Sequence, residues 1–138
     1  MAVITITIPG EMRGKGRPRF STRGGFGRAY TDHKTASAET WVRACAVEQA
    51  GMVPLAGPIS LSIAIAVEVP ASWPKKKRAD ALAGAVFPTS KPDLDNCAKL
   101  IADALNGIVW RDDKQIIRMD LRKHYAERAQ TVLTVAEV

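Results

Sequence analysis

Several features that mark secreted, membrane and zinc-binding proteins are scarce in this sequence. Its two cysteines, Cys45 and Cys97, form no Cys-x-x-Cys pair and have no histidine cluster nearby, which favours buried free thiols over a disulfide framework or a zinc site. The longest apolar runs, such as 61–67, are far too short to cross a bilayer. The N-terminal residues alternate between apolar and polar types and lack the charged segment of a signal peptide. We therefore expect a cytoplasmic protein with no membrane partner.

Acidic residues are also in the minority. The chain contains 20 Lys and Arg against 14 Asp and Glu, which gives a formal charge of +6 and a pI near 9.6. Such a balance suits an anionic partner when the charge is clustered. A hydrophobic content of 46% argues against disorder. The length fits one domain, residues 1–138, and is short for two.

The apolar patterns of the first half predict two strands and a helix. A strand at 4–8 precedes a basic loop, and a helix capped by Thr31 or Asp32 runs to about Ala50. The clearest strand, 59–69, alternates large apolar residues with Ser and Ala. Small residues on its second face suggest a central strand that is covered on both sides.

The second half predicts two helices followed by two strands. A short basic helix begins after Pro74, and an acidic helix begins near Asp95 and stops at Gly107. Alternation at 117–125 and at 131–135 predicts strands that pair with each other as a hairpin. Together these elements predict an α+β fold in which helices pack on a mixed β-sheet.

The loop at about 11–32 concentrates basic residues among glycines, with aromatic residues between them. Such a loop buries no core, but its guanidinium and amide groups suit a phosphate backbone, and its aromatic rings suit unpaired bases. The alternative is a solvated flexible loop. The residues predicted to bind DNA here are Arg13, Lys15, Arg17, Arg19, Arg23 and Arg28.

A second basic block lies on the chain that leads into the acidic segment. It could guide phosphate groups toward that segment, or it could be an ordinary solvated face. Its members, also predicted to bind DNA, are Lys75, Lys76, Lys77 and Arg78. His33, near a helix start, is interpreted as polar surface and is left out of the site.

The segment 91–113 gathers carboxylates inside this basic chain. Asp93 and Asp95 lie two residues apart at the start of the predicted helix, and Asp112 and Asp113 follow its end. A return loop would bring a third carboxylate toward the first pair, and clustered carboxylates are what Mg²⁺ requires. Taken singly, each aspartate is also explained as a helix cap or a turn residue. Their number in a basic chain favours a metal site.

The same segment resembles a known family through four motifs: PDLDN from Pro92 to Asn96, then Lys99, then DAL, then WRDD ending at Asp113. The sequence is similar to the RusA-type Holliday junction resolvases, small metal-dependent endonucleases common in phage and prophage genomes. GKGRPRF, at 14–20, extends the resemblance toward the whole chain and implies a RusA-like fold. The resemblance implies that the metal ligands are Asp93, Asp95 and Asp113, with Asp112 as a weaker candidate, and that Lys99 is a catalytic lysine.

These observations predict an endonuclease that depends on Mg²⁺, with Mn²⁺ as a possible substitute, and that needs no small-molecule cofactor. The resemblance implies that the substrate is branched DNA with a four-way junction, resolved by paired symmetric nicks during recombination and repair. Two symmetric nicks require two sites, so a two-fold homodimer is expected. The alternatives are a metal-dependent nuclease for other branched DNA and a non-catalytic nucleic-acid-binding module.

Overall fold

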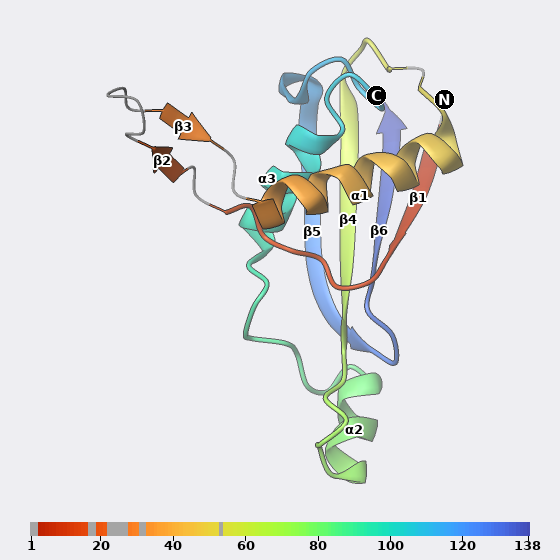
Figure 1. Cartoon of the computed structure of the whole chain (residues 1–138). Coiled ribbons are helices and arrows are strands. Elements are labelled where there is room, and N and C mark those ends of the chain that lie inside the picture. Colours follow the sequence, from red (N-terminus) through yellow and green to blue (C-terminus); the bar gives the residue numbers. More distant parts are fainter. Residues whose placement is uncertain (1–2, 17–18, 22–27, 31–32, 53) are drawn as a thin grey trace.

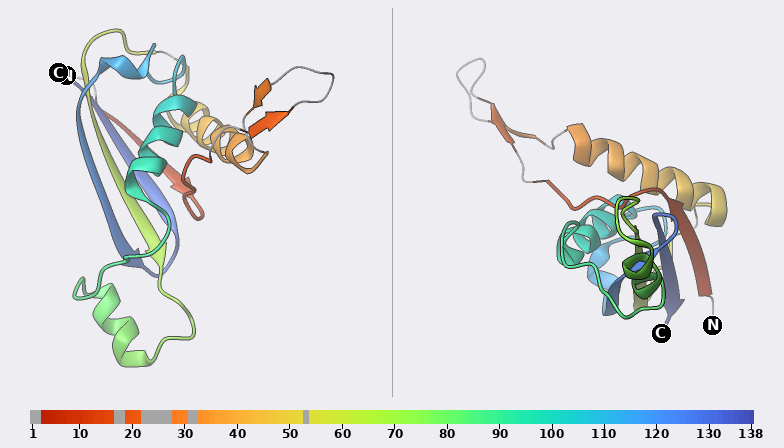
Figure 2. Two further views of the ribbon diagram at one scale, coloured as in Figure 1. Left: turned by 90° about the vertical axis from the view of Figure 1, so that its left-hand side faces the viewer. Right: turned by 90° about the horizontal axis from the view of Figure 1, so that it is seen from below.

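A mixed four-stranded sheet with helices on one face forms the body of the protein (Figures 1 and 2). The computed structural model describes residues 3–16, 33–52 and 54–138, and of 19–21 and 28–30 only the backbone. The sheet has the order β1-β6-β4-β5, with bounds β1 Val3–Pro9, β6 Gln130–Glu137, β4 Ile59–Glu68 and β5 Ile116–Ala126. The remaining elements are β2 Arg19–Ser21, β3 Arg28–Tyr30, α1 His33–Ala50, α2 Lys75–Leu82, α3 Leu94–Ala104 and the 3₁₀ turn η1 Asp113–Gln115. The α+β prediction is confirmed.

Strand β4 is central, and its alternation follows from the position of the helices. Ile59, Leu61, Ile63 and Ile65 are each at most 1% exposed, because they face the layer formed by α1 and α3. The residues between them, such as Ser62, are half-buried on the other face. In the described part of the chain, α1 and α3 lie over one face and α2 lies beyond an end of the sheet, so the expected cover on both sides was wrong.

The predicted hairpin of the last two strands was also wrong. Strand β4 lies between β5 and β6 and pairs in parallel with β5 and antiparallel with β6. Strand β6 also pairs with β1, which gives it two neighbours. Its buried residues Thr131, Leu133 and Val135 are all 0% exposed, so burial places β6 inside the sheet. The charged strand β5 is left at the edge.

Helix α1 covers the sheet through part of the expected apolar stripe. Val42 and Cys45 are 1% and 4% exposed. Trp41, also expected in the stripe, is 50% exposed and donates its indole N–H to the Pro9 carbonyl at 2.9 Å. Thr31 and Asp32, the expected caps, lie outside the described residues. None of the described helices is long and apolar enough to span a membrane.

Helix α3 buries the predicted apolar face and ends at a turn built by glycine. Cys97, Ile101 and Leu105 are 0% exposed and belong to the main core cluster. Gly107 follows with φ at +78°, a conformation that residues with a Cβ rarely adopt. Its amide donates to the carbonyl of Trp110 at 2.7 Å, and Trp110 is 0% exposed. The turn therefore returns the chain from α3 to η1.

Candidate active site on helix α3

The two aspartates of the PDLDN motif lie exposed where α3 begins. Asp93 is the N-cap residue in extended conformation, but its side chain makes no capping hydrogen bond. Its Oδ2 instead accepts from the side-chain amide of Asn96 at 3.3 Å. Asp95 is in the first helical turn, where a negative charge is favoured. Capping therefore does not occupy the Asp93 carboxylate, and both carboxylates are accessible to a cation.

A polar stripe continues along α3 from this pair. Asp95, Lys99 and Asp103 are spaced four residues apart and therefore follow one side of the helix. Lys99 has a side chain that is 66% exposed, and its Nζ lies 3.9 Å from Oδ2 of Asp103. The lysine predicted from the resemblance thus projects from the same side of α3 as Asp95.

Asp112 and Asp113 have different local roles. Asp112 accepts a hydrogen bond from the Lys114 amide at 2.9 Å and forms a capping box with Gln115 at the start of η1. That backbone hydrogen bond holds the pKa of Asp112 below its usual value. The pKa of Asp113 is raised, first by burial, then by the hydrogen bond and charge of Asp112, and then by the charge of Asp103.

The described residues contain no group of three or more His, Cys, Asp or Glu side chains arranged to hold a metal ion. Asp103, whose charge contributes after burial and Asp112 to the raised pKa of Asp113, is eight residues after Asp95, about 12 Å along the helix axis. At the start of α3, the pKa of Cys97 is raised first by burial and then by the charges of Asp93 and Asp95, so these two carboxylates lie near each other. The pair of carboxylates at the start of α3 fits Mg²⁺, which binds one or two carboxylates and completes its shell with water and phosphate. A set that includes Asp113 stays a prediction.

Both cysteines are free and buried, as expected. Burial raises the pKa of the Cys97 thiol to about 11, and the charge of Asp93 adds to this effect. The pKa of Cys45 is also raised, first by burial. The thiols therefore stay protonated and belong to the core.

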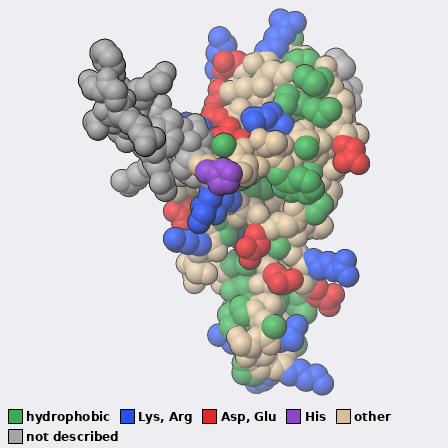
Figure 3. Space-filling model, viewed as in Figure 1, with side chains coloured by type: hydrophobic (Ala, Val, Ile, Leu, Met, Phe, Trp, Pro, Cys, Tyr) green, Lys and Arg blue, Asp and Glu red, His purple; other side chains and the backbone are tan. Residues whose placement is uncertain are grey.

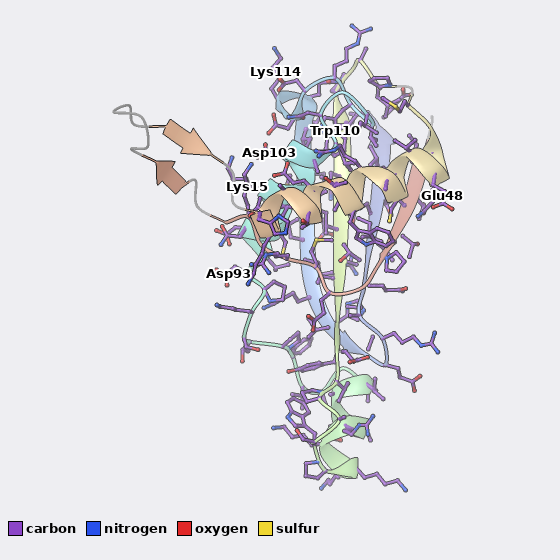
Figure 4. The ribbon with its side chains drawn as sticks, in the orientation of Figure 1. Lys15, Glu48, Asp93, Asp103, Trp110 and Lys114 are labelled. Carbon is purple, nitrogen blue, oxygen red and sulfur yellow. The ribbon has the colours of Figure 1, made fainter. Side chains whose placement is uncertain are left out.

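The start of the basic loop borders a cavity of about 660 Å³ beside Asp93. Arg13, Lys15, Lys91 and Asn96 also contribute to its lining. Arg13 is exposed there, whereas the ammonium group of Lys15 is paired with Asp103 (Figure 4). Of the other residues predicted to bind DNA in this loop, Arg17 and Arg23 lie outside the described residues. Arg19 and Arg28 lie on the ribbon formed by β2 and β3, of which only the backbone is described.

The second basic block forms the first half of α2, which projects beyond an end of the sheet, away from the β2–β3 ribbon (Figures 1 and 2). Its four basic residues are exposed, and blue side chains stand out around that end of the surface (Figure 3). The Nζ of Lys77 lies 3.9 Å from the ring centroid of Trp73, which itself packs edge-on against Tyr125. The described start of the basic loop and α2 therefore form separate surfaces.

Sequence reasoning assigned no role to Asp103, although DAL was part of the resemblance. The structure places it between Lys99, four residues before it, and Lys15, 88 residues before it. The spacing to Lys99 was visible in the sequence as a helical i, i+4 pair. The contact with Lys15 had no local signal, because only the packing of the loop on α3 creates it.

Comparison with known proteins agrees with the resemblance. The family profile described as endodeoxyribonuclease RusA matches residues 9–136 of the chain. The chain is also 32% identical over 140 residues to a protein of Bacillus subtilis (strain 168) named uncharacterized protein YqaN. That alignment covers 100% of this chain and 99% of the relative. The similarity therefore extends over the loop, the helices and the sheet together.

Proposed function

The chain belongs to the RusA endodeoxyribonuclease family, and from this premise we propose that it resolves Holliday junctions by paired symmetric nicks in a reaction that depends on Mg²⁺. That it is an endodeoxyribonuclease follows from the family, which acts on branched DNA. The observation that carries the finer proposal is the exposed stripe on α3, in which Asp93 and Asp95 lie free of capping contacts and Lys99 lies one turn further on.

The residues that would hold the ion are Asp93 and Asp95, with Asp113 as the third predicted ligand. When bound, Mg²⁺ polarises the scissile phosphate, activates a water molecule and stabilises the leaving oxygen. The cap position keeps the Asp93 side chain outside the helix, while Asp95 follows it in the first turn. Asp112 is the weaker candidate because its carboxylate already accepts the Lys114 amide.

Lys99 would supply positive charge to the phosphate oxygens in the transition state. Its exposed ammonium group can reach a DNA strand that lies along the stripe. No metal ligation is required of it, so the residue contributes charge and position. Arg13 and the loop residues that follow would hold the phosphate backbone beside the stripe, and α2 would bind a more distant part of the junction.

We also propose that the active form is a homodimer, and the exposed edge of β5 supports this. Ile117 and Met119 on this edge strand are 62% and 41% exposed. Antiparallel pairing of two β5 strands, centred on Met119, would place Arg118 opposite Asp120 of the partner subunit on both sides of the two-fold axis. In this one register, exposed apolar side chains would pack against each other and opposite charges would pair. A second copy of this chain is therefore a complementary partner for the β5 edge.

The experiment that tests the proposed function is a cleavage assay on labelled synthetic four-way junctions, flaps and linear duplexes, with Mg²⁺, with Mn²⁺ and with a chelator. We expect symmetric nicks in the junction with either metal ion and none with the chelator. Preferential cutting of flaps would assign the protein to other branched DNA. Equal cutting with the chelator would remove the metal from the reaction.

The carboxylate roles are tested by Asp95→Asn and Asp113→Asn. Asn keeps the size and one oxygen of Asp but loses the charge that holds Mg²⁺, so we expect cutting to be abolished while junction binding is kept or slightly tightened. Asn caps helices about as well as Asp, so a purely structural role predicts little change. Lys99→Ala should lose cutting but keep metal binding. Near-parental cutting by a folded Asn variant would exclude that residue from the site.

A further inference from the structure

The start of the basic loop is attached to both helices of the sheet-covering layer. The amide of Lys15 donates to the Asn96 carbonyl on α3 at 3.1 Å, and the amide of Gly16 donates to the Thr35 hydroxyl on α1 at 2.8 Å. A Cβ at Gly14 would lie 2.9 Å from the Cβ of Asn96, so this approach depends on glycine. We call residues 14–16 the stem of the basic loop.

One carboxylate connects the stem to the predicted catalytic lysine. Oδ2 of Asp103 pairs with the ammonium group of Lys15 and lies 3.9 Å from Nζ of Lys99. The side chains of Lys15 and Asp103 are 22% and 24% exposed, whereas that of Lys99 is 66% exposed. Figure 4 shows Lys15 and Asp103 close together, with Asp93 further along the same side of the molecule.

The direction of the Lys99 side chain matters for the carboxylates at the start of α3. Lys99 has an aspartate four residues before it and another four residues after it, and its ion pair in the described part of the chain is with the later one, Asp103. An ammonium group held by Asp95 would compete with a cation for that carboxylate. Pairing with Asp103 leaves Asp95 accessible and still keeps Lys99 on the stripe.

We propose that Asp103 is a positioning residue for DNA cleavage: it fixes the stem through Lys15 and directs Lys99 away from Asp95. This inference rests on the proposed function and adds a residue to it. Ion pairs that are partly exposed contribute little to global stability, so the effect falls on the position of two cationic groups. DNA held by the basic loop would thereby lie in register with the α3 stripe.

The attachment of the stem is tested without any cleavage reaction. Amide-resolved hydrogen exchange by NMR should show the Lys15 amide exchanging about tenfold faster in Asp103→Asn than in the parent. The matched control is Glu39→Gln, since Glu39 is a partly exposed carboxylate in an i, i+4 ion pair with Arg43 at 3.8 Å on α1. The control should leave the Lys15 amide unchanged. Parental exchange in Asp103→Asn would overturn the proposed attachment.

A second variant keeps every charge and moves the stem by steric contact alone. Gly14→Ala introduces the Cβ that would meet Asn96, so it should also speed exchange of the Lys15 amide. Cleavage should fall in Gly14→Ala although Asp103 and Lys99 are intact. Parental cleavage in a Gly14→Ala protein with faster exchange would show that the stem position is irrelevant to the reaction.

The catalytic part is tested by single-turnover cleavage at saturating protein together with junction affinity. We expect Asp103→Asn to cut at least about tenfold more slowly, with a change in Kd of less than about threefold. Lys15→Met should be slower too, and the double variant should be within about twofold of Asp103→Asn because both changes break one contact. Defects that multiply in the double variant would overturn the link through Lys15.

Failure of this inference is distinguishable from failure of the proposed function. A parent protein that does not cut junctions in Mg²⁺ removes the proposed function and, with it, the catalytic part of the inference. The exchange result decides the attachment of the stem by itself. A parent that cuts, beside an Asp103→Asn variant that cuts equally well, removes only the positioning role.

Discussion

Trp110 is the largest fully buried side chain of the described core, and Trp110→Phe tests how the turn before Asp112 and Asp113 is held. Its indole N–H donates to Oδ1 of Asn106 at 2.9 Å. Its carbonyl accepts the Gly107 amide at 2.7 Å. The side chain therefore anchors the chain between α3 and η1 inside the core.

The expected loss of stability comes from two contributions. Loss of the hydrogen bond leaves the Asn106 oxygen to find another partner, and the smaller ring leaves space in the core. Together these effects should cost roughly 2–3 kcal/mol. For a chain of 138 residues, 1 kcal/mol corresponds to about 3–4 °C in Tm, so Tm should fall by about 6–12 °C.

The chain provides a matched control in Trp41→Phe. Trp41 also donates its indole N–H over 2.9 Å, but it is 50% exposed whereas Trp110 is 0% exposed. In Trp41→Phe, water can donate to the Pro9 carbonyl in place of the lost indole N–H, so the expected cost is below about 1 kcal/mol. Urea unfolding followed by circular dichroism, with Tm by calorimetry, measures both variants. Equal losses in the two variants, or a loss below about 1 kcal/mol for Trp110→Phe, would refute the reasoning.

Three further predictions concern the charged loop, the sheet edge and the buried thiols. Replacing Arg17 and Arg19 with Ala should weaken junction binding and lower the slope of log K against log salt by up to about 1.8, or about 0.9 per lost phosphate contact; an unchanged slope in a salt titration would move the interface elsewhere. Sedimentation should give a dimer for the parent and for Val3→Glu, but a monomer for Ile117→Glu, although the two replaced side chains are 61% and 62% exposed; a parent that is monomeric both free and on junction DNA would remove the dimer. The Cys45 thiol, 4% exposed, should resist iodoacetamide at pH 8 until denaturant is added. Because burial raises its pKa above 9.0 in the folded state, the unfolded chain releases the proton first, and this contribution to stability is lost as pH rises past 9.0; rapid labelling of folded protein would contradict it.

Local pattern was sufficient for most of the helices and strands. Alternation of large apolar residues along 59–69 predicted β4, because a strand with one buried face must alternate. The apolar face of α3 and its stop at Gly107 followed from helical spacing and from the conformational freedom of glycine. The sequence alone also showed the cluster of aspartates and its resemblance to one nuclease family.

The sequence by itself determined most of the elements, though not β2 and β3 within the predicted basic loop, and it determined the polar stripe on α3 and the class of enzyme, because each depends on residues close together in the chain. Tertiary structure decided which strands pair: the 131–135 strand lies between β1 and β4 because its buried face needs neighbours on both sides, while the charged 117–125 strand is left at the edge. It also decided that Asp103 holds Lys15 across 88 residues. Contacts over such separations arise only when packing brings α3 and the stem together, and no local periodicity encodes them.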